Sequence, residues 1–226
     1  MAERTRAGRI KVVFAFLLLF GPAILLIIMS TRGCEHKFKE LDDYGAGIDY
    51  KFTDARGKQL SSKDFKDNVV LITTLQPTCP DSCAITMWHL KQSIYNTIYK
   101  NKKKLGSVRI VSFVTDGNGN DVEDVSQVYE MIQDQVEDYD PDIWYIASGE
   151  SKEVFNFENN DQTLLQEGDE YFGGQGYQEL MLLMDRENHL RMVLPGSTEG
   201  MVRRMKECVA LLQKQYDKAD AKKDKK

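Results

Sequence analysis

The hydrophobic positions after residue 49 follow two spacings, which predict an alternation of strands and helices. Two continuous apolar and β-branched runs, Val69–Leu75 and Val108–Thr115, are typical of central strands that are buried on both faces. Apolar residues three and four positions apart predict amphipathic helices between the strands. In chain order the predicted elements are a strand Tyr50–Asp54, a strand Val69–Leu75, a helix Pro80–Lys100, a strand Val108–Thr115, a helix Val122–Val136, a strand Ile143–Ala147, a short helix Ser151–Phe157, a hairpin of Leu180–Asp185 and Leu190–Leu194, and a long helix capped by Ser197.

This order predicts an α/β protein with a thioredoxin-like fold, in which helices flank a central mixed sheet. The β-α-β part gives parallel strands, and the hairpin adds antiparallel ones. The polar, glycine-rich stretch Asp161–Gly176 is predicted to be a mobile loop. A loop that leaves the first buried strand and runs into a helix is where such a sheet exposes its chemistry.

A different pattern marks the N-terminus, where Val12–Met29 is a run of 18 residues without a charged or strongly polar side chain. As a helix it would be about 27 Å long, close to the thickness of a bilayer's hydrocarbon core. Basic residues gather just before it, so the positive-inside rule predicts a cytoplasmic N-terminus and an exported domain. A cleaved secretory signal is the alternative. Whether Cys34 carries a lipid stays open.

The sequence therefore predicts a single-pass protein of the cytoplasmic (inner) membrane whose soluble domain faces the periplasm or an equivalent space. Its predicted segments are a cytoplasmic basic N-terminus (1–11), a transmembrane anchor (12–29), a tether (30–48), the thioredoxin-like domain (49–216) and a charged flexible tail (217–226). The residues after 33 carry 25 basic and 34 acidic groups. Because an acidic domain repels phosphate backbones, we expect no nucleic-acid partner.

Cysteine spacing gives the strongest chemical signal. Thr78-Cys79-Pro80-Asp81-Ser82-Cys83 follows the first buried strand and begins a helix, with Pro80 at the first helical position. The two thiols then share one face and one turn of the helix. Helix N-terminal amides stabilise a thiolate, so Cys79 is the expected nucleophile. Two soft thiolates at this spacing suit Cu(I), and on oxidation they can close a disulfide.

These residues resemble the Sco/SenC family (synthesis of cytochrome c oxidase), and the resemblance runs from about Ile48 to Leu212. Its most specific parts are Phe52-Thr53-Asp54-Ala55-Arg56-Gly57-Lys58, Asp64-Phe65-Lys66 leading into Val69-Val70-Leu71, and Cys79-Pro80-Asp81-Ser82-Cys83. The resemblance implies an anchored thioredoxin fold that binds copper through two thiolates and a distal histidine. It also implies a role in assembling the dinuclear copper site of cytochrome oxidase. The two cysteines carry over as Cys79 and Cys83.

The family's histidine does not carry over. It precedes a YLVD-like run, which is Leu182-Leu183-Met184-Asp185 here, and counting back eight residues from Asp185 reaches Tyr177, with Gln178 beside it. The family's DPxxDT-like loop is also changed, to Asp116-Gly117-Asn118-Gly119-Asn120-Asp121. The third ligand is therefore unknown, and we expect Cu(I) rather than Cu(II) to bind.

Other candidate ligands have simpler interpretations. We expect His36 to be a linker residue, His89 to lie on the polar surface of the first helix, and His189 to lie in the hairpin turn, far from the dithiol. Met181 and Met184 could offer a thioether to Cu(I), but they are expected in the core. Cys208 lies on the apolar stripe of the last helix and is expected to be a buried structural thiol.

Two functions from different classes remain. The first is a membrane-anchored copper chaperone of Sco type, whose partner is a cytochrome oxidase subunit. The second is an enzyme, a thiol–disulfide oxidoreductase in which Cys79 attacks a disulfide of another extracytoplasmic thiol protein and Cys83 resolves the mixed disulfide. The resemblance favours the first, and the missing histidine favours the second.

Overall fold

The computed structural model describes residue 14 and residues 16–22, 40–77, 86–159, 162–165 and 176–223 of the 226-residue chain. It divides into two compact units, Met1–Lys39 and Glu40–Lys226. In the first unit the described residues are helical. Among the residues that the structure describes, no helix is long and apolar enough to cross a membrane, and the remainder of the predicted anchor 12–29 lies outside them.

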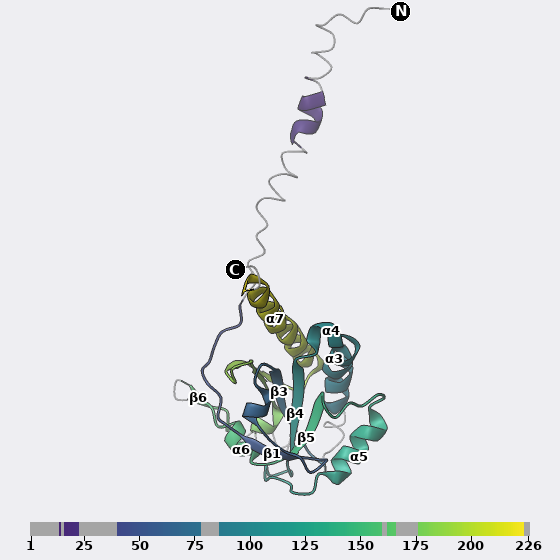
Figure 1. Cartoon of the computed structure of the whole chain (residues 1–226), viewed down its shortest axis with the longest axis vertical. Helices are drawn as coiled ribbons and strands as arrows, with labels where there is room; N and C mark the ends of the chain where they lie inside the picture. The colour runs from purple at the N-terminus through teal and green to yellow at the C-terminus, as the bar shows by residue number, and fades with distance from the viewer. Residues whose placement is uncertain are drawn as a thin grey trace, which may run out of the picture. The chain divides into compact units, whose positions relative to one another are not determined.

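The second unit is built on a mixed sheet. Its strands are β1 (Lys51–Asp54), β2 (Gln59–Ser61), β3 (Val69–Leu75), β4 (Val108–Val114), β5 (Trp144–Ser148), β8 (Leu180–Met184) and β9 (Leu190–Pro195). They form a seven-stranded sheet in the order β2-β1-β5-β4-β3-β8-β9 (Figure 1). The central strands β3, β4 and β5 are parallel, and an antiparallel hairpin lies at each edge. The predicted mixed sheet is confirmed.

Helices accompany this sheet. They are η1 (Ser62–Phe65), a helical turn at residues 86–89 that continues through η2 (Leu90–Tyr95) and α3 (Asn96–Lys100), α4 (Lys102–Leu105), α5 (Ser126–Gln135), α6 (Ser151–Val154), η4 (Gly176–Glu179) and α7 (Glu199–Lys223). The stripe predicted for the first helix is confirmed, because Met87, Leu90, Ile94 and Ile98 are all buried. The central part of that helix, η2, has π rather than α geometry.

The two faces of the sheet have separate hydrophobic cores. Along β3, Leu71 belongs to the core that includes residues of η2, α3, α5 and α7, whereas its neighbour Ile72 belongs to the core on the other face. Both side chains are fully buried. This burial explains why the strand is a continuous apolar run in the sequence rather than an alternating one.

The first core contains three polar groups that satisfy one another. The hydroxyls of Thr73 and Ser112 lie 2.7 Å apart, and the indole Nε1 of Trp144 donates to Ser112 Oγ over 2.9 Å. Because each hydroxyl and the indole has a partner, these groups avoid the cost of burying an unpaired polar atom. They also link β3, β4 and β5 through their side chains.

Several predicted boundaries move in the structure. The helix predicted from Val122 begins at Ser126, because residue 121 pairs with Thr115 and the Asp124 carboxylate accepts the backbone N–H of Ser126. The last helix is capped by Thr198 rather than Ser197, with Thr198 Oγ1 3.4 Å from the N–H of Met201. It continues to Lys223, past residue 217, where we expected the flexible tail to begin.

Three short hairpin strands were not predicted. The first is β2, at the edge of the main sheet. The other two, β6 (Glu158–Asn159) and β7 (Gln162–Thr163), form a small ladder that lies partly inside the stretch predicted as a mobile loop. The rest of that stretch, apart from residues 164–165 and 176, lies outside the described residues.

The second half of the expected tether is bound to the domain. Tyr44 N–H donates to the carbonyl of Leu190 over 2.9 Å, and Leu190 N–H donates back to Gly45. Arg191 donates to the carbonyls of Leu41 and Asp42, and the Asp43 carboxylate pairs with His189 Nδ1 at 2.9 Å. From Glu40 onward this segment therefore lies along the β8–β9 hairpin.

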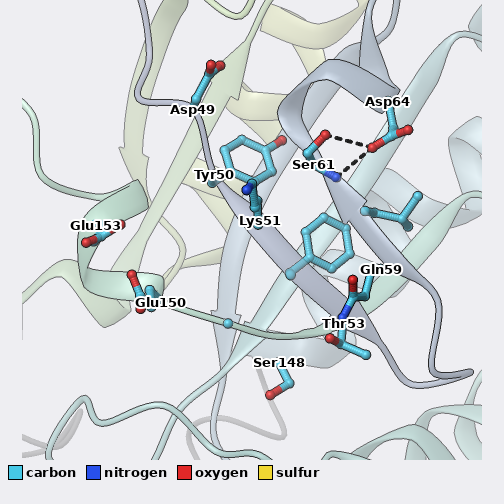
Figure 2. A pocket seen from close by; sticks show the side chains of 13 residues that line it. Asp49, Tyr50, Lys51, Thr53, Gln59, Ser61, Asp64, Ser148, Glu150 and Glu153 are labelled. Carbon is cyan, nitrogen blue, oxygen red and sulfur yellow. Dashed lines mark hydrogen bonds between the residues drawn. The ribbon is translucent and has the colours of Figure 1, made fainter.

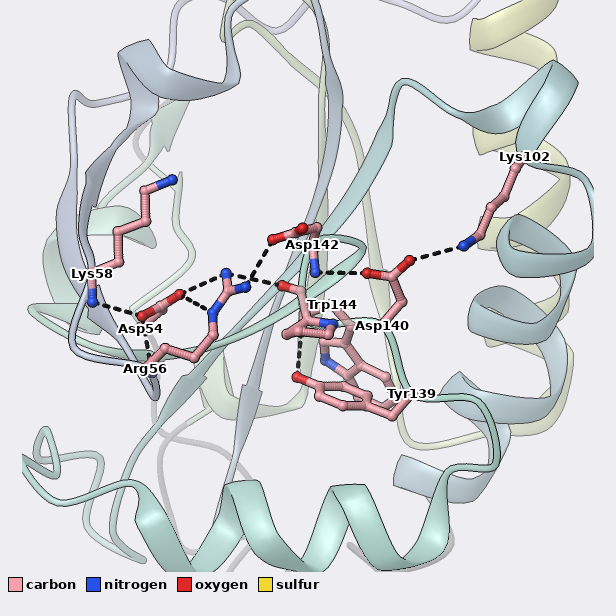
Figure 3. A network of polar contacts seen from close by, with 9 residues as sticks. Asp54, Arg56, Lys58, Lys102, Tyr139, Asp140, Asp142 and Trp144 are labelled. Atoms are coloured by element: carbon pink, nitrogen blue, oxygen red, sulfur yellow. Dashed lines mark hydrogen bonds and ion pairs between the residues drawn. The ribbon is translucent and has the colours of Figure 1, made fainter.

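A buried carboxylate organises the β1–β2 turn (Figure 3). Asp54 is 4% exposed and accepts the backbone N–H groups of Arg56 and Lys58, at 3.0 and 2.8 Å. Its second oxygen accepts the guanidinium of Arg56, which also pairs with Asp142 before β5. Gly57, with φ of 79°, supplies the left-handed residue that the turn needs. These contacts give a structural reason for the Asp54–Lys58 motif.

Replacing Asp54 should therefore destabilise the domain. We expect Asp54→Ala to lower the free energy of unfolding by about 2–3 kcal/mol, because two part-buried N–H groups and the Arg56 guanidinium lose their acceptor. Urea denaturation measures the difference. Lys63→Ala is the control, since it breaks only the exposed pair with Asp49 and should cost less than about 1 kcal/mol. Equal costs for the two variants would contradict this account.

The pair of His189 and Asp43 should make stability depend on pH. The hydrogen bond to the Asp43 carboxylate raises the pKa of His189, and the charges of Asp43, Asp185 and Glu187 assist. The same bond lowers the pKa of Asp43. The imidazolium contribution is complete below the unfolded histidine pKa and is lost as pH rises through the higher folded pKa. The contribution of the Asp43 carboxylate is lost as pH falls through its lowered folded pKa.

We therefore expect the stabilisation to be largest between about pH 4 and 6.5. Urea denaturation of wild type and His189→Gln should show the largest difference within that window and a shrinking one as pH rises above it. Asp43→Asn should remove the same pH dependence. A difference that stays constant with pH would refute the ion pair.

Candidate functional site

Three segments that are far apart in the sequence meet at the end of the sheet where β3 and β4 finish. β3 and β4 are parallel and in register at their carboxyl ends, where Leu75 pairs with Val114. β8 is antiparallel to β3, so the beginning of β8 and the preceding helix η4 reach the same edge. The chain after β3, the chain after β4 and η4 therefore surround one position.

The predicted dithiol belongs to the first of these segments. Cys79 and Cys83 lie in residues 78–85, outside the described residues, so their geometry stays a prediction. The described chain reaches Pro77, two residues beyond β3, and resumes in a helix at Thr86. A strand that leads into a helix is the context that the cysteine motif predicts.

Gln178 lies near the carboxyl ends of β3 and β4, and its amide nitrogen is engaged in hydrogen bonds. Its Nε2 donates to Thr115 Oγ1 and to the carbonyl of Asp116, both over 2.7 Å. Its own backbone carbonyl accepts the hydroxyl of Thr74 near the end of β3, at 2.8 Å. Gln178 is only 8% exposed. It therefore joins η4 to the ends of both β3 and β4.

Tyr177 points into the core on the other side. It is 1% exposed and packs against Phe155, with ring centroids 5.3 Å apart. Its hydroxyl donates to the carbonyl of Gly119 over 2.7 Å. Burial raises the pKa of Tyr177, so the side chain stays a neutral donor. Of the two residues at the expected histidine position, it is the one fixed within the core.

Both residues thus hold the same loop, Asp116–Asp121, which is the loop that differs from the family pattern. Inside the loop, the Asp116 carboxylate accepts the side chain of Asn120 and the backbone N–H groups of Asn118 and Asn120. The bond from the Asn120 side chain lowers the pKa of Asp116 against the opposing effect of burial, and the two backbone donors assist. The loop is therefore closed by an ionised carboxylate and held by Tyr177 and Gln178. The sequence marked these positions as changed but did not reveal that they bind one another.

None of the histidines in the described residues lies as a ligand at the end of the sheet where β3 and β4 finish. His189 lies at the β8–β9 turn, at the opposite end of β8 from η4, and pairs with Asp43. His89 is half-buried rather than on the surface as expected, and its ring centroid lies 5.1 Å from that of Trp88. His36 and Cys34 lie outside the described residues. Within the described part of the chain, no three His, Cys, Asp or Glu side chains group as a metal site would require.

The sulfur-bearing side chains that are described belong to the cores. Met181 and Met184 are buried on opposite faces of β8, and Cys208 is buried on the stripe of α7, as predicted. A packing role accounts for all three.

A hollow of about 700 Å³ lies along the edge hairpin of β1 and β2 (Figure 2). Carboxylates line it, including Asp49, Asp64, Glu150 and Glu153. Two strands, β5 and β4, separate β1 from β3 in the sheet. The hollow therefore does not belong to the candidate site.

A mixed sheet with parallel central strands, flanking helices and a predicted dithiol loop after β3 defines a thioredoxin-like α/β protein. Within that class the family is specific, because the model described as SCO1/SenC matches residues 39–210. The chain belongs to the SCO1/SenC family. The resemblance stated from the sequence is confirmed.

Several solved structures are similar to this chain. A SCO1/SenC family lipoprotein from Bacillus anthracis is 21% identical, with a TM-score of 0.53, over 73% of this chain and 95% of that one. BsSco, described as a Sco-family cytochrome c oxidase assembly protein with a disulfide switch, is 14% identical, with a TM-score of 0.50, over 76% and 98%. Copper-bound ScoI of Arabidopsis thaliana is 17% identical, with a TM-score of 0.49, over 75% and 99%. The first two show a shared fold. A search of the curated proteins found no match.

The Tyr177 hydroxyl should contribute to holding the Asp116–Asp121 loop. Tyr177→Phe leaves the ring packing intact but deprives the Gly119 carbonyl of its donor, so we expect a loss of about 1–2 kcal/mol in the free energy of unfolding. Urea denaturation measures it. Tyr44→Phe, at a ring that is 45% exposed, is the control and should change stability little. If Tyr177→Phe leaves the free energy of unfolding unchanged, this hydrogen bond does not hold the loop.

Proposed function

We propose that this chain is a membrane-anchored copper chaperone of the SCO1/SenC family that binds Cu(I) through Cys79 and Cys83. It assists assembly of the copper site of cytochrome c oxidase, whose subunit is the partner. The observation that carries the proposal is the family match over residues 39–210, which includes both cysteines. The β3 context of the cysteine segment supports it.

The donor set at this edge favours Cu(I) as the cargo. Two thiolates are soft ligands and satisfy Cu(I) at low coordination number, whereas Cu(II) prefers nitrogen and oxygen donors in a fuller shell. An imidazole is missing at the family position, and the amide nitrogen of Gln178 and the hydroxyl of Tyr177 are both engaged with the Asp116–Asp121 loop. Two-sulfur coordination therefore needs no further protein ligand.

The proposed topology follows from the N-terminal sequence. Residues 12–29 cross the cytoplasmic membrane once, and the domain from 49 to 216 faces the periplasm or an equivalent space. The attachment of residues 40–48 to the β8–β9 hairpin leaves a tether of about ten residues before the domain begins.

A thiol–disulfide oxidoreductase is the second candidate. Cys79 thiolate would attack a partner disulfide, and Cys83 thiolate would then displace the partner, which leaves as a dithiol while this chain becomes the disulfide. The observation in its favour is that the position of the family's histidine is occupied by residues that bind a loop. BsSco is described with a disulfide switch, and this chain's dithiol is suited to the same chemistry.

Anaerobic titration of the reduced full chain with Cu(I), combined with X-ray absorption at the copper edge, tests the first proposal. We expect one Cu(I) held by two sulfur atoms, and loss of that binding in Cys79→Ser and Cys83→Ser. Cys208→Ser is the matched control, because this thiol lies in the core and should not affect binding. A reduced chain that ignores Cu(I), yet reduces a model disulfide through Cys79, would establish the second candidate instead.

Restoring an imidazole should add Cu(II) binding. We expect Gln178→His to strengthen Cu(II) binding more than Cu(I) binding, and more than Tyr177→His does. The reason is that Gln178 lies between the ends of β3 and β4, whereas Tyr177 packs against Phe155 in the second core. Spectroscopic titration of both variants with each oxidation state measures this. A stronger effect of Tyr177→His would show that the core relaxes to admit it.

A further inference from the structure

Basic residues gather at the end of the sheet where β3 and β4 begin. Residues 100–109 lead into β4 and contain no acidic residue but five basic ones: Lys100, Lys102, Lys103, Lys104 and Arg109. The first residue of β4 pairs with the first residue of β3, so this end lies opposite the one that leads into the cysteine segment. The chain after residue 33 is acidic as a whole, with 34 acidic and 25 basic groups. A local reversal of charge in an acidic domain favours an anionic partner.

A second basic segment lies beside the first. The helix α4 packs against α7 (Figure 1), and Ser107 Oγ, just after α4, donates to Gln213 Oε1 in α7 over 2.9 Å. Lys214 and Lys218 are exposed and stand four residues apart on α7, so they share one face of that helix. The intervening Asp217 accepts the side-chain nitrogen of Gln213. The lysines of α4 and of α7 therefore belong to one region of the surface.

The charges of α4 are only partly neutralised. Lys102 is the lysine that faces carboxylates, because it pairs with Asp140 at 2.9 Å and lies near Asp138. Lys103 and Lys104 are exposed, and within the part of the chain that the structure describes neither takes part in an ion pair. These two side chains therefore present their full charge to the surroundings of the domain.

The chain that follows the predicted anchor enters the domain at this same end. Residues 40–48 are bound along the β8–β9 hairpin, and β8 ends beside the first residues of β3. Arg186, in the turn of that hairpin, reaches α7, where it pairs with Asp220 at 2.9 Å and lies over the ring of Tyr216. The entry of the tether, the hairpin turn and both basic segments thus lie together.

We propose that the basic surface formed by Lys103, Lys104, Lys214 and Lys218 binds the anionic phospholipid headgroups of the membrane that carries the anchor. This inference rests on the proposed function, because the membrane is the one that the proposed topology assigns. Each lysine near an anionic membrane contributes a small attraction, and several together orient a domain that is already tethered. Attachment at this end turns the opposite end of the sheet away from the bilayer. The cysteine segment then faces a partner whose own site projects from the membrane.

Lysine acetylation in the full chain, reconstituted in lipid nanodiscs, tests this surface. We expect acetylation of Lys103 and Lys104, measured by mass spectrometry, to be roughly threefold or more slower with phosphatidylglycerol present than in phosphatidylcholine alone. High salt should abolish the difference, because it screens exposed charges. Lys152 is the internal control, since it is exposed but lies near Asp116 at the other end of the sheet. It should react equally in both lipids.

Charge reversal separates this surface from unspecific attraction. The double variant Lys103→Glu with Lys104→Glu should remove the slowing of acetylation at Lys100, which is exposed at the end of α3. Lys152→Glu is the matched control and should leave that slowing intact. Both changes are at exposed positions, and urea denaturation checks that both variants fold. Equal acetylation in the two lipids, or a slowing at Lys100 that survives the charge reversal, would overturn the inference.

Failure of the proposed function gives a different result. If the full chain enters neither nanodisc, the predicted anchor is wrong, and sedimentation with phosphatidylglycerol vesicles tests the surface alone. Binding that the double variant abolishes supports the surface, and absence of binding overturns it. If the Cu(I) titration finds no copper binding while the acetylation pattern is as expected, the copper function fails and the membrane surface stands.

Discussion

The antiparallel pairing of β8 with β3 is the constraint on which the candidate site depends. Ile72 pairs with Leu182, and both side chains are fully buried between the two faces of the sheet. A slip of one residue would move every buried side chain of β8 to the opposite core, so the register is strongly specified. With β4 parallel on the other side of β3, this register brings η4 level with the ends of both strands. Residues some 60 to 100 positions apart thus become neighbours.

The two places at which the sequence departs from the expected family pattern contact one another. Tyr177 and Gln178 stand where the histidine was expected, and the carbonyls that they bind, Gly119 and Asp116, belong to the Asp116–Asp121 loop. Each side of the contact would be poorly satisfied without the other, because buried donors and acceptors need partners. A change at one of these two places is therefore expected to require a change at the other.

The sequence predicted what depends on local pattern and missed what depends on distant partners. β3 was predicted with its bounds, because a strand buried on both faces is apolar at every position. β2 was missed, since a three-residue edge strand of mixed polarity has too short a pattern to detect. Counting back from Asp185 led to Tyr177 and Gln178, which lie in η4 just before β8. It could not show that the amide of Gln178 reaches Thr115, because that contact depends on the register of three strands.

The position of Gln178 is fixed by contacts with two neighbouring strands. Its side-chain nitrogen donates to Thr115 Oγ1, just after β4, and to the carbonyl of Asp116. Its backbone carbonyl accepts the hydroxyl of Thr74 in β3. Because rotation of the amide would give up two hydrogen bonds, the side chain is held in one orientation. A substitution at residue 178 therefore acts on the Asp116–Asp121 loop as well as on its own surroundings.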